Sequence, residues 1–218
     1  MAQLFHRWTN VLARTSLVAI PIALAGSFAL FGLLYRSPYF TDIFVSRKQP
    51  IPFSHKHHVG ELAIDCRYCH DTVEKSAFAG LPALETCMHC HSQIWAQSPL
   101  LKPVREGFRE DRSIAWARVN QLPDYVAFDH SIHLKKGVGC ESCHGRVDEM
   151  PLVWKQHPLT MKWCLSCHLA PERFLRPREQ VFKMGWQPDG DPEALGRSLV
   201  QRYHISKQRM ADCAVCHR

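Results

Sequence analysis

Five copies of the pattern C-x-x-C-H account for all ten cysteines of this 218-residue chain. Each copy places two thiols and one imidazole within five residues, and no cysteine remains for a disulfide. The ten cysteines are Cys66, Cys69, Cys87, Cys90, Cys140, Cys143, Cys164, Cys167, Cys213 and Cys216.

C-x-x-C-H is typical of covalent haem c attachment. Cysteines three apart on a helical turn share one face, so both thiols reach vinyl groups at one porphyrin edge. The next histidine then gives the proximal bond to iron. A zinc ribbon shares C-x-x-C but does not need that histidine, which follows all five copies here. We therefore expect five haem c groups, with proximal ligands His70, His91, His144, His168 and His217.

The spacing of these motifs indicates a duplication. Their first cysteines are 21, 53, 24 and 49 residues apart, a short interval followed by a long one, twice; internal repeats of this kind define the architecture. The pattern F-x-H-x-x-H precedes the first motif from Phe53 and the third from Phe128. An extracytoplasmic haem domain is thus predicted over 37–218, with repeats at 53–91 and 128–168 and a terminal haem segment at 169–218.

The F-x-H-x-x-H histidines are the predicted distal iron ligands. Histidines at i and i+3 project from the same side of a turn and can reach two neighbouring haems. His57 is expected to point away, His89 to be exposed, and His6 precedes the apolar segment. The four predicted distal ligands are His55, His58, His130 and His133.

A fifth distal ligand remains open. A methionine is favoured, because methionine ligation raises the potential relative to a histidine pair and gives one higher-potential haem. Met161 lies three residues before Cys164 and would have to serve a neighbouring haem. The candidates are Met161, Met150, His157 and His204.

The segment 15–35 has no charged residue and is predicted to span a membrane within an anchor at 1–36. About 20 apolar residues cross the hydrocarbon core as a helix. The alternative is a signal peptide cleaved after Ala25, but the apolar run continues ten residues beyond it. Because bacterial c-type haems are attached outside the cytoplasm, we expect a single pass through the inner membrane and a periplasmic haem domain.

The fold class is predicted as mainly α and irregular, with short helices and little strand around the haems. No alternating run is long enough for a sheet. Asp191 and Pro192 are typical of a helix start, and Leu195, Leu199 and Tyr203 then share one face. The formal charge of +7 falls to about +2 once five haems with ionised propionates are counted, so no nucleic-acid partner is expected.

The chain resembles class III, c7-like multihaem cytochromes, and more closely the pentahaem cytochrome c subunit of bacterial alternative complex III. A quinone reductase complex of sulfate reducers has a similar subunit, said to carry six haems, and five sites here favour the first family. The segments that carry the resemblance are 52–55, 114–119, 122–126, 159–164 and 216–218.

The resemblance implies an electron-transfer subunit with no catalytic residue of its own. Its expected partners are an integral-membrane quinol-oxidising subunit, an iron–sulfur subunit related to molybdopterin enzymes, and a monohaem cytochrome c or terminal oxidase. The alternative is a free-standing, membrane-anchored quinol dehydrogenase that feeds a periplasmic reductase. A multihaem reductase is disfavoured, because it needs an open iron position and distal candidates are plentiful here.

Overall fold

The computed structural model describes residues 4–217. Its contacts divide the chain into two compact units, one ending at Ile43 and the other beginning at Phe44. The first contains α1 (Trp8–Arg36) and the short α2 (Pro38–Thr41). The contacts of α2 are thus with the apolar helix, although the predicted haem domain begins at residue 37.

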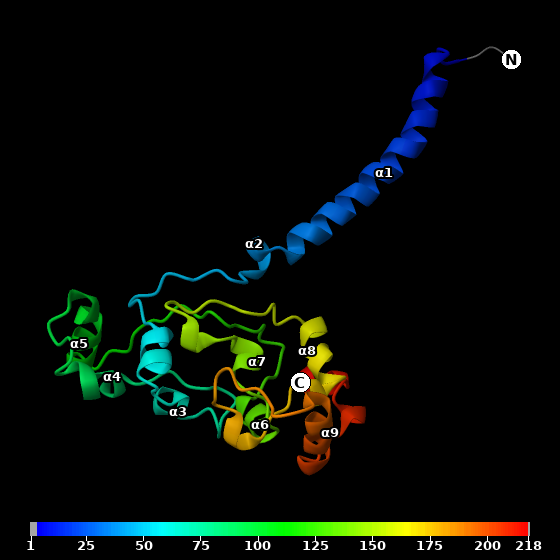
Figure 1. Cartoon of the computed structure of the whole chain (residues 1–218). Coiled ribbons are helices and arrows are strands. Elements are labelled where there is room, and N and C mark those ends of the chain that lie inside the picture. The colour runs from blue at the N-terminus through cyan, green and yellow to red at the C-terminus, as the bar shows by residue number, and fades with distance from the viewer. Residues whose placement is uncertain (1–3, 218) are drawn as a thin grey trace. The chain divides into compact units, whose positions relative to one another are not determined.

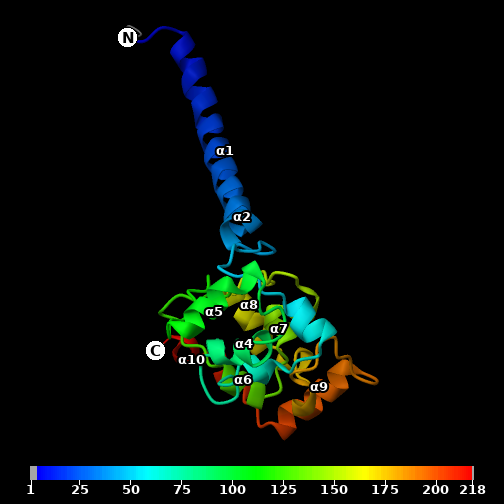
Figure 2. The ribbon, with the colours of Figure 1, turned by 90° about the vertical axis from the view of Figure 1, so that its left-hand side faces the viewer.

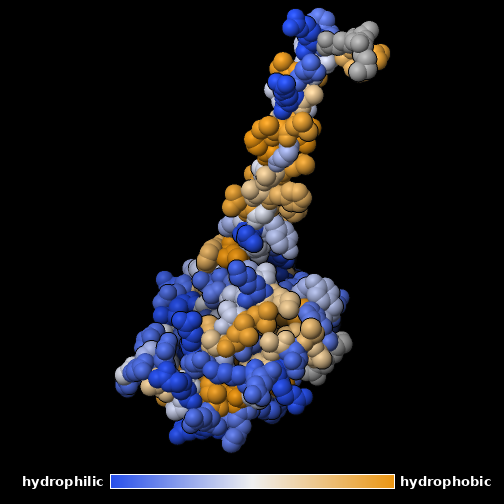
Figure 3. Space-filling view, turned by 90° about the vertical axis from the view of Figure 1, so that its right-hand side faces the viewer, coloured by the Kyte–Doolittle hydropathy of each residue, from blue (hydrophilic) through white to orange (hydrophobic). Residues whose placement is uncertain are grey.

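α1 is a single helix of 29 residues with no buried side chain. Its most apolar window has a mean hydropathy of 2.3, and apolar side chains cover much of its middle part (Figure 3). The hydroxyls of Thr15 and Ser27 donate to the carbonyls of Val11 and Ala23, so neither is left unbonded in an apolar medium. A helix with these properties could span a membrane, although a signal sequence has the same length and composition.

The second unit consists of short helices joined by irregular segments (Figures 1 and 2). Most of its helices are one or two turns long. In chain order they are η1 (Lys56–Glu61), α3 (Cys66–Cys69), α4 (Leu84–His91), η2 (Pro99–Leu101), α5 (Lys102–Arg109), α6 (His130–Lys135), α7 (Glu141–His144), η3 (Val147–Glu149), α8 (Met161–His168), η4 (Pro171–Arg173), η5 (Arg178–Gln180), α9 (Pro192–Arg202), η6 (Lys207–Arg209) and α10 (Cys213–Cys216).

Between residues 4 and 217 strand pairing is limited to isolated bridges, among them Ser46 with Trp154 and Val138 with Leu175. No sheet forms in that range, which confirms the predicted mainly helical and irregular fold.

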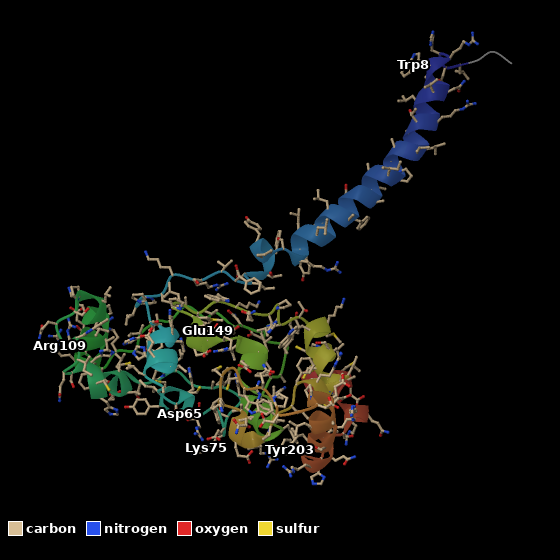
Figure 4. The ribbon with its side chains drawn as sticks, viewed as in Figure 1. Trp8, Asp65, Lys75, Arg109, Glu149 and Tyr203 are labelled. Atoms are coloured by element: carbon tan, nitrogen blue, oxygen red, sulfur yellow. The ribbon has the colours of Figure 1, made fainter. Side chains whose placement is uncertain are left out.

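Two small apolar clusters form the buried protein core of the second unit. One of them includes Leu199 of α9, which is 1% exposed, and Tyr203, which follows at the end of that helix (Figure 4). Asp191 caps α9 as predicted, accepting a hydrogen bond from Glu193 N at 2.9 Å. The clusters are Ile51, Leu84, Leu101 and Val104, and Val138, Leu175, Leu199 and Tyr203.

Two elements were not predicted from the sequence. α5 packs against α4, the helix of the second motif, and contributes Val104 to the first cluster. The turn after His55 is a π-helix, η1, whereas the equivalent turn of the second repeat is the α-helix α6. The same histidine spacing is therefore held by two helix types.

Gly196 is the point at which α9 meets η4. A Cβ at this position would overlap the Glu172 carbonyl. We expect Gly196→Ala to destabilise the holoprotein by about 1–3 kcal/mol through overpacking, whereas alanine normally favours a helix. Ser198→Ala, an exposed change on the same helix, is the control. Thermal unfolding followed by circular dichroism measures both, and a raised midpoint for Gly196→Ala would contradict the packing.

Candidate haem-binding sites

Each C-x-x-C-H motif occupies one short helix of the second unit, and the thiols form no disulfide. Asp65 caps α3 by accepting a hydrogen bond from Arg67 N at 2.8 Å (Figure 4). Thr160 caps α8 in the same way, accepting from Trp163 N at 3.4 Å. The helical turn brings both thiols of a motif to one face, where one ring edge could bond to both.

The two F-x-H-x-x-H turns have nearly the same internal geometry. In each, the phenylalanine ring stacks on the second histidine, with ring centres 4.4 Å apart in the first repeat and 4.6 Å in the second. The same ring meets the first histidine edge-on, at 4.9 and 4.8 Å. The phenylalanine thus fixes both imidazoles. The residues are Phe53, His55 and His58, and Phe128, His130 and His133.

Each of these turns is bonded to the other repeat. Lys56 N donates to the Met150 carbonyl at 3.0 Å, and Ser131 N donates to the Ser76 carbonyl at 3.3 Å. Lys56 and Ser131 each follow the first histidine of their turn, and Met150 and Ser76 each lie six residues after a motif histidine. The two repeats are therefore joined by reciprocal backbone hydrogen bonds.

Four imidazole pairs form, each joining one F-x-H-x-x-H histidine to one motif histidine. Their ring centres lie 6.1 to 6.5 Å apart. Because neighbouring histidines of one turn face different motifs, each turn serves two motifs. The pairs are His55 with His70 (6.5 Å, ring planes 3° apart), His58 with His91 (6.1 Å, 64°), His130 with His144 (6.3 Å, 7°) and His133 with His168 (6.2 Å, 30°).

This separation fits two imidazoles on opposite sides of one iron. Metal–imidazole bonds are about 2.0–2.1 Å long and the ring centre lies roughly 1 Å behind the bonding nitrogen, so two such rings have centres roughly 6 Å apart. All four pairs match that spacing, and each includes a histidine next to two thiols on one turn. The residues present therefore fit a covalently attached, doubly ligated haem at four motifs.

Hydrogen bonds at Nδ1 orient most of these rings. The motifs contribute five histidines and the turns four. Seven of these nine donate from Nδ1 to a backbone carbonyl at 2.7–3.1 Å. That tautomer leaves the lone pair on Nε2, the nitrogen available to a metal. The acceptors are Ser54 for His58, Gly80 for His70, Ile94 for His91, Ala77 for His130, Asp129 for His133, Met210 for His168 and Tyr125 for His217.

Two histidines depart from this pattern. His144 Nδ1 lies 3.1 Å from the side-chain amide nitrogen of Asn120, and the amide oxygen of Asn120 is buried without a partner. His55 Nδ1 is buried without a hydrogen-bond partner among the residues described. The first and third motifs, which otherwise match, thus differ in how their histidines are held.

Burial keeps the central imidazoles neutral, as metal ligation requires. It lowers the pKa of His144 to about 4, with the charges of His130 and His70 as further causes. Burial likewise lowers the pKa of His55 to about 4, followed by the charge of His70. The charge of His70 thus lowers the pKa of His144 in the third motif as well as that of its own partner, His55. The first and third motifs are therefore neighbours.

The cysteines show which other motifs are neighbours. The thiols of Cys66 in the first motif and Cys140 in the third share a hydrogen bond. This bond is the main cause of a raised pKa at Cys140, and burial is the next. Burial, followed by the charge of Cys87, raises the pKa of Cys69, so the first and second motifs are close.

The same kind of contact links the later motifs. Burial and then the charge of Cys167 raise the pKa of Cys143 to about 12. Burial and then the charge of Cys216 raise the pKa of Cys164. The motifs therefore follow one another in space as second, first, third, fourth and fifth.

The fifth motif has no imidazole partner within the described residues. His217 is exposed, and its ring lies 5.9 Å from that of Tyr125. The four candidates for its second ligand have different surroundings: Met150 is 1% exposed, Met161 is 60% exposed, His157 stacks on Trp163 at 5.1 Å, and His204 is exposed.

The remaining histidines do not pair with a motif ring. His57 Nδ1 lies 2.8 Å from the carboxylate of Glu61, and His89 Nδ1 lies 2.8 Å from the Tyr68 hydroxyl. Both histidines are exposed. His6 lies in the first unit.

A buried ion pair supports the third motif. Arg176, with 8% of its side chain exposed, contacts Glu141 of α7 at 2.6 Å. The second carboxylate oxygen of Glu141 accepts from Gly185 N at 2.6 Å. A Cβ at Gly139 would collide with the Arg176 guanidinium, so a larger residue directly before Cys140 would displace that side chain. This pair and Asn120 gave no sequence signal, because their partners are distant in the chain.

Comparisons with known proteins agree with the duplicated arrangement. Residues 37–105 match the family model described as class III cytochrome C, and residues 126–218 match that of cytochrome c7 and related cytochrome c. The chain is 35% identical over 189 residues to the menaquinone reductase, multiheme cytochrome c subunit, of Nitratidesulfovibrio vulgaris (strain Hildenborough). That alignment covers 81% of this chain and 80% of the relative.

Removing Arg176 is expected to destabilise the third motif strongly. Arg176→Met leaves the Glu141 carboxylate buried without its counter-ion, a change that typically costs about 3–5 kcal/mol. We expect a lower unfolding midpoint and less haem at Cys140 and Cys143, measured by circular dichroism and by mass spectrometry of peptides.

The double variant Arg176→Met/Glu141→Leu removes the unpaired charge and is expected to recover much of the loss. Arg112→Met, at an exposed pair with Glu110, is the control and should change neither measurement. An Arg176→Met protein as stable as that control would contradict the assigned role.

Proposed function

Because the chain belongs to the class III, c7-like multihaem cytochrome c family, we propose that its second unit carries five covalent haems and conducts electrons between partner proteins. The observation that carries this proposal is the set of four imidazole pairs, each spaced for one iron and each adjoining two thiols. The fifth C-x-x-C-H motif supplies the fifth attachment site.

In this proposal the residues divide into three roles. The ten motif cysteines form thioether bonds, the five motif histidines are proximal ligands, and the four F-x-H-x-x-H histidines are distal ligands. Bound haem supplies a one-electron couple between ferric and ferrous iron. The protein's own part is to hold most of these imidazoles by a hydrogen bond at Nδ1, so that Nε2 would face the iron. The distal assignments are His55 to the first motif, His58 to the second, His130 to the third and His133 to the fourth.

The proposed path through the domain follows the spatial order of the motifs: second, first, third, fourth and fifth. It is supported by the cysteine contacts, in which each motif adjoins the next. Cys90 in the second motif and Cys213 in the fifth are the exposed cysteines of the chain. The ends of the path are thus the places where partners would exchange electrons.

We propose Met161 as the second ligand at the fifth motif. It lies in the first turn of α8, and Cys164 of the same helix adjoins Cys216 of the fifth motif. Met150, in contrast, is buried beside η1, where its carbonyl accepts from Lys56 N. Methionine ligation would make this haem the highest in potential.

Full ligation supports a role in conduction without catalysis. A haem that reduces a small molecule needs an open iron position, whereas four of the five motifs have a paired imidazole. We therefore propose that the chain is the electron-transfer subunit of a membrane complex that exchanges electrons with quinone. α1 would anchor it in the bacterial inner membrane, with the haem domain on the periplasmic side.

The proposed direction is quinol oxidation. A multi-spanning subunit and an iron–sulfur subunit related to molybdopterin enzymes would deliver electrons, and a monohaem cytochrome c or an oxidase would receive them. The opposite direction is the second candidate, because the similar chain of N. vulgaris is named as a subunit of a menaquinone reductase. The architecture of this subunit suits either direction.

Purification in mild detergent tests the complex and its direction. We expect membrane-embedded and iron–sulfur partners to accompany the full chain, and a menaquinol analogue to reduce the assembly. An assembly that instead reduces menaquinone from a reduced cytochrome, with slow quinol oxidation, would favour the second candidate. A lone chain that oxidises quinol at the full rate would overturn the subunit role in favour of the free-standing dehydrogenase.

Removing one distal histidine should open one iron. We expect His58→Ala to give a holoprotein that binds carbon monoxide at one reduced haem, because the partner of His91 is lost. His57→Ala, next to it in the chain but paired with Glu61, is the matched control and should bind no more than the parent. The Soret difference spectrum measures both, and equal carbon monoxide binding by the two variants would contradict the distal assignment.

A further inference from the structure

One histidine of the proposed haem sites is held by a side chain. Seven rings donate from Nδ1 to backbone carbonyls, which the fold itself fixes. His144 instead faces Asn120, whose side-chain amide nitrogen lies 3.1 Å from Nδ1. A side-chain partner, unlike a backbone carbonyl, can be changed in length and charge by a single substitution.

The amide orientation follows from the chemistry of the ring. With its amide nitrogen toward His144, Asn120 would donate to Nδ1, and the ring proton would then sit on Nε2. A half-turn about the Cβ–Cγ bond exchanges the two amide atoms. The oxygen then accepts from Nδ1–H, and Nε2 keeps the lone pair that faces His130 across 6.3 Å between ring centres.

We propose that Asn120 is a positioning residue that fixes the Nε2-ligating tautomer of His144 and lowers the reduction potential of the haem at the third motif. An imidazole whose Nδ1–H donates a hydrogen bond to an acceptor becomes a more electron-rich ligand. A more electron-rich ligand favours ferric iron over ferrous iron. This inference rests on the proposed haem site between His130 and His144.

The two equivalent sites would consequently differ in potential. At the third motif both rings have acceptors, Ala77 O for His130 and Asn120 for His144. At the first motif His70 donates to Gly80 O, but His55 Nδ1 is buried without a protein acceptor. The third motif should therefore hold the lower-potential haem of the two. It also lies in the middle of the proposed path, next to both the first and fourth motifs.

Asn120 lies in the linker between the repeats, and the same linker contacts the last motif. Tyr125 O accepts from His217 Nδ1 at 3.1 Å, and Ala127 N donates to the Cys216 carbonyl at 2.7 Å. A general loosening of this linker could alter the sites indirectly, so the test needs a control for that effect. Gln49 provides it, because its amide bonds twice to Ala117, three residues before Asn120, and to no histidine in these contacts.

The experiment is a redox titration of the full-length holoprotein and three variants, followed by absorbance and by electron paramagnetic resonance. Asn120→Leu removes the acceptor and is expected to shift one haem's oxidised-to-reduced ratio at a fixed potential about tenfold towards the reduced form. For a one-electron couple this equals a rise of about 59 mV. Asn120→Asp keeps an acceptor and adds negative charge, so the same haem should shift towards the oxidised form. Gln49→Leu should leave the potential of that haem unchanged.

Resonance spectra narrow the assignment of the shifted haem to one class of ring pair. Nearly parallel ring planes, such as the 7° of His130 and His144, give a rhombic low-spin signal, whereas the crossed planes of His58 and His91, at 64°, give a highly anisotropic one. The shifted component is expected in the rhombic class, which the His55–His70 pair at 3° shares. A shift of the highly anisotropic component instead would overturn the assignment to the third motif.

Unmoved potentials in Asn120→Leu, or an equal shift in Gln49→Leu, would overturn the role of Asn120. Should Asn120→Leu fail to assemble, Asn120→Asp decides: a shift towards the oxidised form supports the proposal, and an unmoved potential overturns it. The parent protein's haem count separates these outcomes from a failure of the proposed function, because a parent with no haem at Cys140 and Cys143 would fail before any variant is compared.

Discussion

The separation of paired imidazole rings is the constraint on which the second unit depends. Two imidazoles that share one iron stand about 6 Å apart. Short helices and irregular linkers hold four pairs of rings at that separation from distant parts of the chain. A phenylalanine fixes two rings in each turn, and backbone carbonyls fix the tautomer of most. The buried protein core is correspondingly small, with two clusters of four residues in the described chain. In the proposed holoprotein, haem would fill much of the remaining interior, so folding and haem attachment would be coupled.

Local sequence rules predicted the parts of this structure that depend on neighbours in the chain. The cap at Asp191, the shared face of Leu199 and Tyr203, and the lack of a sheet in the described residues follow from propensity and periodicity. The F-x-H-x-x-H repeats indicated which histidines to expect at iron, and the structure brings each of them opposite a motif histidine.

Other features depend on contacts between distant segments, which spacing alone does not encode. The assignment of each turn histidine to its motif required the ring pairs themselves, which join residues that are distant in the chain. Asn120 gave no signal because an asparagine in a linker is ordinarily a turn residue. Arg176 looked like one of many surface cations until its partner Glu141 was seen beside it. The unequal environments of His55 and His130 were also hidden, since the two turns have the same pattern.

The reciprocal hydrogen bonds between the repeats have an evolutionary consequence. Lys56 N to Met150 O and Ser131 N to Ser76 O are the same bond made in both directions, and the thiols in contact, Cys66 and Cys140, are the first cysteines of equivalent motifs. A contact in which each half offers the same surface to the other is the signature of an isologous, two-fold dimer. The two halves are thus arranged as the subunits of a homodimer would be, with a pseudo-two-fold axis between the first and third motifs. Gene fusion of such a dimer would free the two copies to diverge. His130 Nδ1 has a carbonyl partner and His55 Nδ1 has none within residues 4–217, an asymmetry that a homodimer of identical chains could not encode.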